Sequence, residues 1–195
     1  MKNKPMTCKK CKGRIVLPAF STGTCESCGA EIVSTNTPPD RLCPKCALIE
    51  ARCEHCGEKL DIPVVLLSLQ PRWWKLIASG EKTLELRKTA PKIKGEFFVL
   101  VYVTAPVSKI MGMFRCPDVL GPFTAGTLFF SPDHKVPAEE MADYAAGKRL
   151  YCWKICDVQK FDESSGIAPI SLGEIGLSHP PQSWCYYHGK QAKGG

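Results

Sequence analysis

The segment VVLLSLQPRWWKLIASGEKTLELR, residues 64–87, contains the signals that decide the fold of this chain. Residues 64–69 form a short apolar run, which is typical of a buried strand. Pro71 suits the first turn of a helix, and Gly80 suits its end. A second strand is predicted at residues 81–88, because apolar and polar side chains alternate there. The segment therefore predicts a strand, a helix and a second strand in succession.

The predicted helix has one apolar face. Trp73, Leu76 and Ile77 share this face, which indicates that they pack against a core. Trp74 lies off the face, so we expect it to be partly exposed. A tryptophan on an apolar face more commonly packs in the core than stacks on a ligand, and we therefore favour core packing for Trp73.

The second predicted strand divides its side chains between two faces. Leu84 and Leu86 point to one side, because successive side chains of a strand alternate. The opposite side carries Thr83, Glu85 and Arg87. Lys82 lies at the start of the strand and can bend toward either face. This polar stripe is either a set of ordinary cross-strand ion pairs on an exposed face or part of a ligand-binding site.

The rest of the chain continues this pattern of short strands. Further strands are predicted at residues 97–103, 108–114, 150–161 and 183–187, and a further helix at residues 136–146. The helix would begin near Pro137 and end at Gly147. Many short strands with few helices predict an α+β fold built on a small β-barrel with flanking helices.

The N-terminal part of the chain is rich in cysteine. Eight of the twelve cysteines lie within the first 56 residues, as four C-x-x-C pairs. The pairs are Cys8/Cys11, Cys25/Cys28, Cys43/Cys46 and Cys53/Cys56. A C-x-x-C turn points two sulfurs at one place, and two such turns supply the four thiolates of a tetrahedral zinc site. The sequence therefore predicts a small zinc-ribbon-like module that binds two zinc ions.

Disulfides and a redox motif are the alternatives to zinc for these pairs. Disulfides require an oxidising compartment, but residues 1–7 contain no apolar run that resembles a signal peptide. No stretch reaches the roughly 20 apolar residues of a membrane span. We therefore expect a cytoplasmic protein with reduced thiols and no membrane partner. A redox C-x-x-C motif normally occurs once rather than four times.

The sequence leaves open which pairs share an ion. We favour sequential pairing, in which the first two pairs form one site and the last two, joined by a six-residue connection, form the other. Crossed pairing of the first pair with the third, and of the second with the fourth, is also possible. His55 is expected to be a bystander, because both sites already have four sulfurs. The other cysteines are expected to be reduced: Cys116, Cys152, Cys156 and Cys185.

Composition changes near residue 60 and predicts a zinc-binding module at residues 1–60 and a second domain at residues 63–190. The module has few apolar residues, so we expect metal binding to supply its folding energy. The formal charge of the chain is +7, which invites a nucleic-acid interpretation. Two zinc ions held by eight thiolates would together carry about −4 and lower the charge to about +3. The overall charge is then a weak argument for a polyanion partner.

The strand, the helix that begins with proline and the following strand resemble an ASCH (activating signal cointegrator homology) domain. The resemblance rests on G-x-K-x-x-E-x-R at residues 80–87 and on Pro-Pro-Gln-Ser-Trp at residues 180–184. It covers about residues 63–188 and implies a PUA-like β-barrel. Cysteine-rich segments joined to such a domain resemble proteins of phages and prophages, which would place this protein in the cytoplasm of a host.

The resemblance implies that the chain binds RNA or a modified nucleoside in a cleft of the barrel. Arg87 can form paired hydrogen bonds to a phosphate or a base edge, Lys82 can donate from its ammonium, and Glu85 can accept from an exocyclic amine. A tryptophan can stack on a base. The candidate ligand-binding residues are Lys82, Glu85, Arg87, Trp74, Gln182, Ser183 and Trp184.

The resemblance also raises an enzymatic alternative. Some small ASCH proteins are amidohydrolases that act on a modified cytidine, and others have been proposed as ribonucleases. The amidohydrolase pattern has a threonine nucleophile three residues after the lysine, but that position here is Glu85, and Thr83 directly follows Lys82. Lys82 or Glu85 would then have to serve as the catalytic base. A third alternative is an adaptor whose zinc module binds DNA or a protein.

Overall fold

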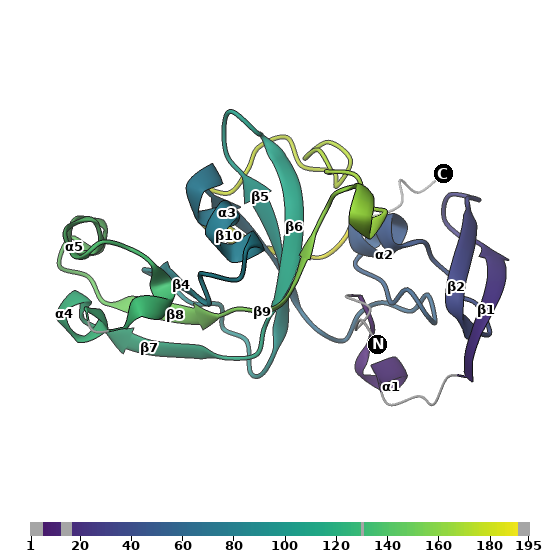
Figure 1. Cartoon of the computed structure of the whole chain (residues 1–195), viewed down its shortest axis with the longest axis horizontal. Coiled ribbons are helices and arrows are strands. Elements are labelled where there is room, and N and C mark those ends of the chain that lie inside the picture. Colours follow the sequence, from purple (N-terminus) through teal and green to yellow (C-terminus); the bar gives the residue numbers. More distant parts are fainter. Residues whose placement is uncertain (1–5, 13–16, 130, 191–195) are drawn as a thin grey trace.

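The computed structural model describes residues 6–12, 17–129 and 131–190, which form a mixed α+β fold (Figure 1). The described residues contain ten strands and five α-helices, and the predicted α+β class is confirmed, although the strands of these residues form open sheets rather than a closed barrel. Hydrogen bonds join the strands into a five-stranded sheet, a three-stranded sheet and a two-stranded hairpin. Within these residues no helix is both long enough and apolar enough to cross a membrane.

The five-stranded sheet is the centre of the molecule. Its strands, in spatial order, are β10 (Trp184–Tyr187), β3 (Val64–Leu69), β5 (Phe97–Val103), β6 (Lys109–Cys116) and β9 (Cys156–Lys160). β3 and β5 are parallel, and the other neighbours are antiparallel. Every residue of β3 and β5 is buried, because separate hydrophobic clusters cover the two faces. This double burial explains the apolar run without alternation at residues 64–69.

The three-stranded sheet carries the polar stripe. Its strands, in spatial order, are β4 (Leu84–Arg87), β8 (Leu150–Lys154) and β7 (Val119–Phe123). The helices α4 (Ala125–Leu128) and α5 (Ala138–Ala145) lie at one end of this sheet (Figure 1). Leu84 and Leu86 pack into the cluster that these helices form with the sheet. The prediction that Leu84 and Leu86 lie on the same face of β4 is therefore confirmed.

The long strand predicted at residues 150–161 is divided between the two sheets. Its first part is β8, which pairs with β4 and β7, and its second part is β9, which pairs with β6. The chain changes sheets at Ile155, and Asp157 has a φ of 51°, which is uncommon for a residue other than glycine. Alternation of side chains continues across this irregularity, so the sequence pattern does not reveal it.

The helix α3 (Pro71–Ala78) confirms the predicted helix, but the exposure expected for Trp74 is wrong. Trp74 is only 9% exposed and belongs to a hydrophobic cluster. Trp73 is partly buried and packs against the same cluster. The reason lies on β6, where Gly112 has no side chain. A Cβ atom at Gly112 would lie 2.3 Å from the ring of Trp74. The ring therefore occupies space above the sheet that helical periodicity cannot indicate.

The cysteine-rich segment forms a module of two short helices and a hairpin. Its elements are α1 (Lys9–Lys12), β1 (Leu17–Thr24), β2 (Glu31–Thr37) and α2 (Pro44–Glu50). β1 and β2 pair antiparallel. The hairpin lies at the far end of the molecule, and α2 lies between it and the five-stranded sheet (Figure 1). The helix is therefore the part of the module that faces the rest of the chain.

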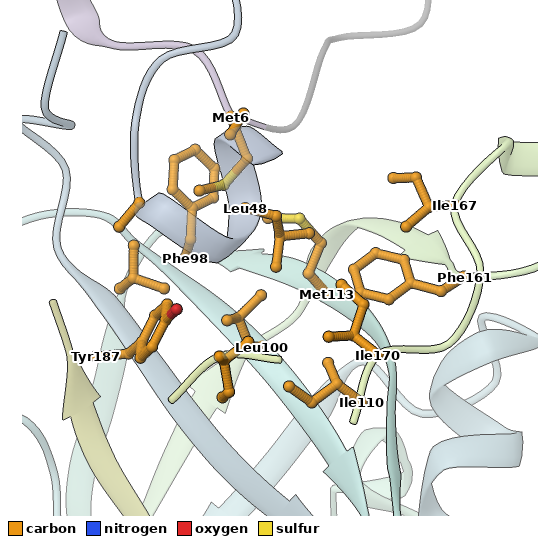
Figure 2. Packing of buried hydrophobic residues seen from close by; sticks show 14 of the residues in the cluster. Met6, Leu48, Phe98, Leu100, Ile110, Met113, Phe161, Ile167, Ile170 and Tyr187 are labelled. Atoms are coloured by element: carbon orange, nitrogen blue, oxygen red, sulfur yellow. The ribbon is translucent and has the colours of Figure 1, made fainter. Parts of the chain in front are cut away.

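The module and the five-stranded sheet share one hydrophobic cluster. Met6 and Leu48 of the module are completely buried in the same cluster as Phe98 and Leu100 of β5 (Figure 2). The module has too few apolar residues to bury a core by itself, and one face of the sheet supplies the missing surface. Burial of this apolar surface stabilises the module in addition to any bound metal.

The C-terminal residues hold α2 in this position. The Tyr187 hydroxyl and the Lys190 backbone N–H both donate hydrogen bonds to the carbonyl oxygen of Ile49, the second at 2.8 Å. Gly189 lies between them with a φ of 83°, and a Cβ atom there would lie 2.2 Å from the carbonyl oxygen of Glu50. Only glycine allows such a close approach of two backbones.

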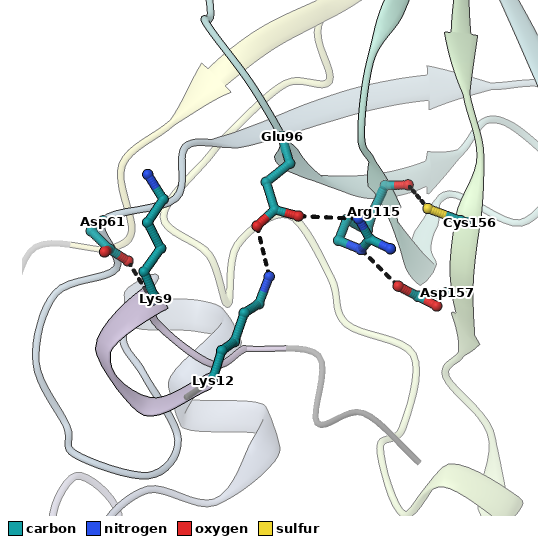
Figure 3. Close-up of polar contacts among 7 residues, drawn as sticks. All are labelled: Lys9, Lys12, Asp61, Glu96, Arg115, Cys156 and Asp157. Carbon is teal, nitrogen blue, oxygen red and sulfur yellow. Dashed lines mark hydrogen bonds and ion pairs between the residues drawn. The ribbon is translucent and has the colours of Figure 1, made fainter. Parts of the chain in front are cut away.

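Ion pairs join the other end of the module to the sheet (Figure 3). The Glu96 carboxylate contacts the Lys12 ammonium at 2.7 Å and the Arg115 guanidinium at 3.1 Å. Arg115 also contacts Asp157 at 2.7 Å. The hydrogen bond from Lys12 holds the pKa of the Glu96 carboxyl below its usual range, although partial burial opposes this. α1 is thus connected to both β6 and β9.

We expect Gly112→Ala to lower the free energy of unfolding by about 1–3 kcal/mol, because the new Cβ overlaps the ring of Trp74. Urea unfolding followed by tryptophan fluorescence measures this change. Gly126→Ala in α4 is the matched control, since no atom lies closer than 4.0 Å to its added Cβ. Equal stability of the two variants would contradict the packing of α3 on β6.

Candidate ligand site and metal centres

Three charged side chains of the predicted motif are buried together. Lys82 is 1% exposed, Glu85 5% and Arg87 9%. The Glu85 carboxylate lies between the two cations, with Oε2 3.3 Å from Lys82 Nζ and Oε1 3.0 Å from Arg87 Nη2. The three charges do form ion pairs with one another, but the exposed face expected in that alternative is wrong, because the side chains are buried. Buried charges are retained only when they are paired.

The local structure explains how each side chain reaches this place. Glu85 and Arg87 lie on the face of β4 opposite the leucines, as the parity of the strand predicts. Lys82 precedes the strand and is fixed by its backbone N–H, which donates to the carbonyl of Leu76 at 3.0 Å. Its ammonium donates to the carbonyl of His134. The lysine therefore connects α3, β4 and the turn that contains His134.

Arg87 connects the two sheets. Its Nη2 donates to the carbonyl of Ser68 in β3 at 2.8 Å, and its Nη1 donates to the hydroxyl of Ser183 at 3.4 Å. Within the described part of the chain, the Nε atom of Arg87 is buried and has no hydrogen-bond partner. The guanidinium is thus held on two sides, and its Nε–H is a buried donor without a partner among the described residues.

Burial dominates the electrostatics of Lys82. It lowers the pKa of the ammonium, the neighbouring Glu85 carboxylate raises it, and the Arg87 guanidinium lowers it again. The ring of Trp73 also lies against this ammonium, with Nζ 5.1 Å from the ring centroid. Lys82 therefore releases its proton more readily than an exposed lysine. A buried titratable group with a specific charged partner is characteristic of functional sites.

The predicted aromatic and amide residues lie in different surroundings. Trp184 donates from Nε1 to Thr89 Oγ1 at 2.9 Å and packs edge-on against Trp153 at 5.7 Å between ring centroids. Trp74 is in the core and offers no free ring face, so its ligand-binding role is not supported. Gln182 is exposed. The motif and Ser183 are brought together, whereas Trp74 is not part of the group.

Three residues that the sequence pattern does not single out complete this arrangement. Ser68 and His134 supply the carbonyls that bind Arg87 and Lys82, and Trp153 lies opposite Glu85 in the pairing of β4 with β8. Ser68 gave a weak signal, since it is the one polar residue in the apolar run 64–69. His134 and Trp153 gave none, because only the tertiary fold brings them to the motif.

The eight N-terminal cysteines form two groups of four. One group is Cys8, Cys11, Cys53 and Cys56, and the other is Cys25, Cys28, Cys43 and Cys46. Within each group all sulfurs lie within 4.8 Å of one another. Two measured separations are 3.8 Å and 3.9 Å. A tetrahedral ion with sulfur ligands at about 2.3 Å requires sulfurs about 3.8 Å apart, so both groups fit such an ion.

The pairs are nested, so the sequential pairing that we favoured is wrong, and so is the crossed alternative. The first pair joins the fourth, and the second joins the third. The reason is α2 (Pro44–Glu50), which begins within the third pair, includes Cys46 and continues into the connection at residues 47–52 between the third and fourth pairs. A helix of seven residues is about 10 Å long. It holds the third and fourth pairs apart at its two ends.

The thiol groups are arranged as metal ligands usually are. Backbone N–H groups point at the sulfurs, as from Cys43 to Cys25 at 3.3 Å and from Cys8 to Cys53 at 3.4 Å. Burial raises the pKa of Cys25, but these backbone donors outweigh it and bring the pKa to about 7. Burial and the neighbouring thiols raise the pKa of Cys11. Without a cation the thiol of Cys11 therefore keeps its proton, and a bound cation would favour its thiolate.

His55 is a bystander, as predicted. Its Nδ1 lies 3.2 Å from Asp40 Oδ1, and Asp40 Oδ2 accepts a hydrogen bond from Ser34 at 2.8 Å. Neither cysteine group includes the histidine. The buried pair connects the loop of one group to the hairpin beside the other. The two cysteine groups are therefore parts of one packed unit.

No protein-family profile and no curated protein matches this chain. Solved structures do match. The ASCH protein from Zymomonas mobilis has a TM-score of 0.54 and 24% sequence identity over 63% of this chain and 86% of that chain. A single-residue mutant of that protein gives the same TM-score and identity over 64% of this chain and 90% of its own. The likeness shows that the chain has the fold of an ASCH protein, as the motif predicted.

We expect Glu85→Ala to lower the free energy of unfolding by about 3–5 kcal/mol, because it leaves two buried cations without their shared carboxylate. Chemical unfolding followed by circular dichroism measures the loss. Glu81→Ala, at an exposed carboxylate four residues earlier, should change stability by no more than about 0.5 kcal/mol. A small effect at Glu85 would show that the charges are solvated.

Proposed function

We propose that the chain binds RNA or a modified nucleoside at the site formed by Lys82, Glu85 and Arg87. The main support is the buried Glu85 carboxylate, which lies between the cations of Lys82 and Arg87. The Nε donor of Arg87 has no partner among the described residues. Burying this much charge lowers the stability of the fold. The cost indicates that the charges serve a purpose other than stability. The ASCH-like fold supports a nucleic-acid-related role in general.

The chemistry of the site suits a nucleotide. Arg87 is held by Ser68 and Ser183, so its guanidinium is oriented before a ligand arrives and can donate to a phosphate or a base edge. Glu85 accepts hydrogen bonds, which suits an exocyclic amine of a base. The partly buried ring of Trp184 lies beside Ser183 in the chain and supplies an aromatic surface. Polar and aromatic groups of this kind are typical of unpaired-base recognition.

We expect Arg87→Lys to weaken the binding of a short single-stranded RNA about tenfold, because lysine keeps the charge but loses the planar fork. Fluorescence anisotropy with a labelled RNA hexamer measures the affinity, and thermal melting verifies folding. Arg149→Lys, at an exposed arginine, is the matched control. Unchanged affinity of Arg87→Lys for the hexamer and for a panel of modified nucleosides would overturn the proposal.

We also propose that the two cysteine groups bind one zinc ion each. The support is the four-sulfur donor set of each group and the sulfur separations of 3.8 Å and 3.9 Å. A bound zinc would hold both ends of α2 and thereby fix the surface that packs on the sheet. Metal binding would then add to the stability that the shared hydrophobic cluster provides.

We expect native mass spectrometry to detect two zinc ions per chain. Paired cysteine substitutions test which C-x-x-C pairs share an ion. Cys8→Ser with Cys53→Ser alters one group and should remove one ion, whereas Cys8→Ser with Cys25→Ser alters both groups and should remove both. Cys185→Ser, outside the groups, should leave two ions bound. The reverse result for the two double variants would restore sequential pairing, and a wild-type chain without metal would exclude the zinc sites.

A hydrolase that acts on a modified nucleoside or on RNA is a second candidate. The lowered pKa of Lys82 beside the Glu85 carboxylate favours it, because such a lysine can act as a base. Thr83 is exposed while Lys82 is buried, so the threonine is not placed for attack from this site. A water molecule would have to be the nucleophile. Release of cytidine from N4-acylated cytidine would distinguish a hydrolase from a binder.

A further inference from the structure

A row of aromatic side chains extends away from the candidate site along β10. Trp184, Tyr186 and His188 are alternate residues, so they project from the same side of the chain. The centroids of Trp184 and Tyr186 are 5.5 Å apart, and those of Tyr186 and His188 are 6.4 Å apart with nearly parallel rings at 22°. The three rings form a continuous series rather than separate surface residues.

The row is accessible and rigid. Tyr186 is 41% exposed and His188 is exposed. The hydroxyl of Tyr186 accepts a hydrogen bond from the backbone N–H of Lys92 at 2.8 Å, and Trp184 is bonded to Thr89. β10 is an edge strand of the five-stranded sheet, so no neighbouring strand lies on its outer side. Aromatic groups that are both fixed and exposed lose little entropy when they stack on a partner.

The row ends at a charged cavity of about 400 Å³ in the cysteine module. His188 lines this cavity, together with the cations Arg41, Arg52, Lys59 and Lys190 and the carboxylates Glu50 and Glu58. Arg41 is paired with Glu26 and Arg52 with Glu50. Lys59 and Lys190 are exposed, and among the described residues neither forms an ion pair. Two ammonium groups are therefore free to contact an anion.

We propose that single-stranded RNA binds along the β10 track, which consists of Trp184, Tyr186, His188 and the cavity beyond them. The RNA would extend from the candidate site to the cysteine module. The inference rests on the proposed function and adds a polymeric ligand and a direction to it. Tyr186 and His188 lie nearly parallel, with ring centroids 6.4 Å apart, and unpaired bases can stack on the exposed faces of these two rings. Lys59 and Lys190 then contact phosphates.

A single strand fits this surface better than a duplex or a protein. Bases expose their faces for stacking only when they are unpaired. A charged cavity with free ammonium groups at the end of an aromatic row matches a chain that carries both rings and phosphates. An apolar protein segment would leave Lys59 and Lys190 unpaired and desolvated at the cavity, which is costly.

The test compares oligouridine of three and nine nucleotides by fluorescence anisotropy, with the full-length protein. The nonamer should bind wild type at least tenfold more tightly than the trimer. The double variant Tyr186→Ala with His188→Ala should bind the nonamer about tenfold more weakly than wild type and bind the trimer with unchanged affinity. Phe20→Ala, at an exposed aromatic residue of β1, is the matched control. Thermal melting verifies that each variant folds.

Further outcomes separate the two proposals. Equal affinity of wild type for both lengths, or no effect of the double variant on the nonamer, would overturn the track even if Arg87→Lys still weakens the trimer. Lys59→Ala with Lys190→Ala should reduce the slope of log affinity against log salt by about 1.4, at about 0.7 per phosphate. An unchanged slope would exclude the cavity. A DNA nonamer that binds as tightly as RNA would overturn RNA as the occupant.

Discussion

The shared carboxylate of Glu85 connects the parts of the ASCH-like region. It pairs with both Lys82 and Arg87 in a buried place. Arg87 in turn binds the backbone of β3 in the five-stranded sheet, and Lys82 binds the turn at His134. A buried charge without a partner costs several kcal/mol, which is a large part of the roughly 5–15 kcal/mol that stabilises a domain. The relative position of the two sheets therefore depends on this group.

The cysteine module depends on the same sheet in a different way. Its helix α2 buries Leu48 against β5, and the nested cysteine groups lie at the two ends of that helix. A metal bound at these groups would therefore stabilise the same helix that hydrophobic burial against the sheet stabilises. A helix of seven residues is too short to be stable by itself in water. The module is thus integrated with the sheet rather than attached by a flexible connection.

Strand β10 belongs to both parts. Tyr187 packs in the cluster under the module and binds Ile49, whereas Trp184 and Tyr186 are on the other side of the strand, near Thr89 and Lys92. One short strand thus positions a residue next to the candidate site and also closes the module. The strand therefore holds the candidate site and the cysteine module in a fixed arrangement.

The amino-acid sequence specifies the local elements, the cysteine pairs and the motif. Residues 64–87 specify a strand, a helix and a strand through hydrophobic pattern, Pro71 and Gly80, and these signals act over a few residues. Tertiary structure alone decided that the motif is buried, that Trp74 packs over Gly112 and that the cysteine pairs are nested. Each of these depends on contacts between residues far apart in the chain. Local patterns record the periodicity of one element, but not the surface against which it packs.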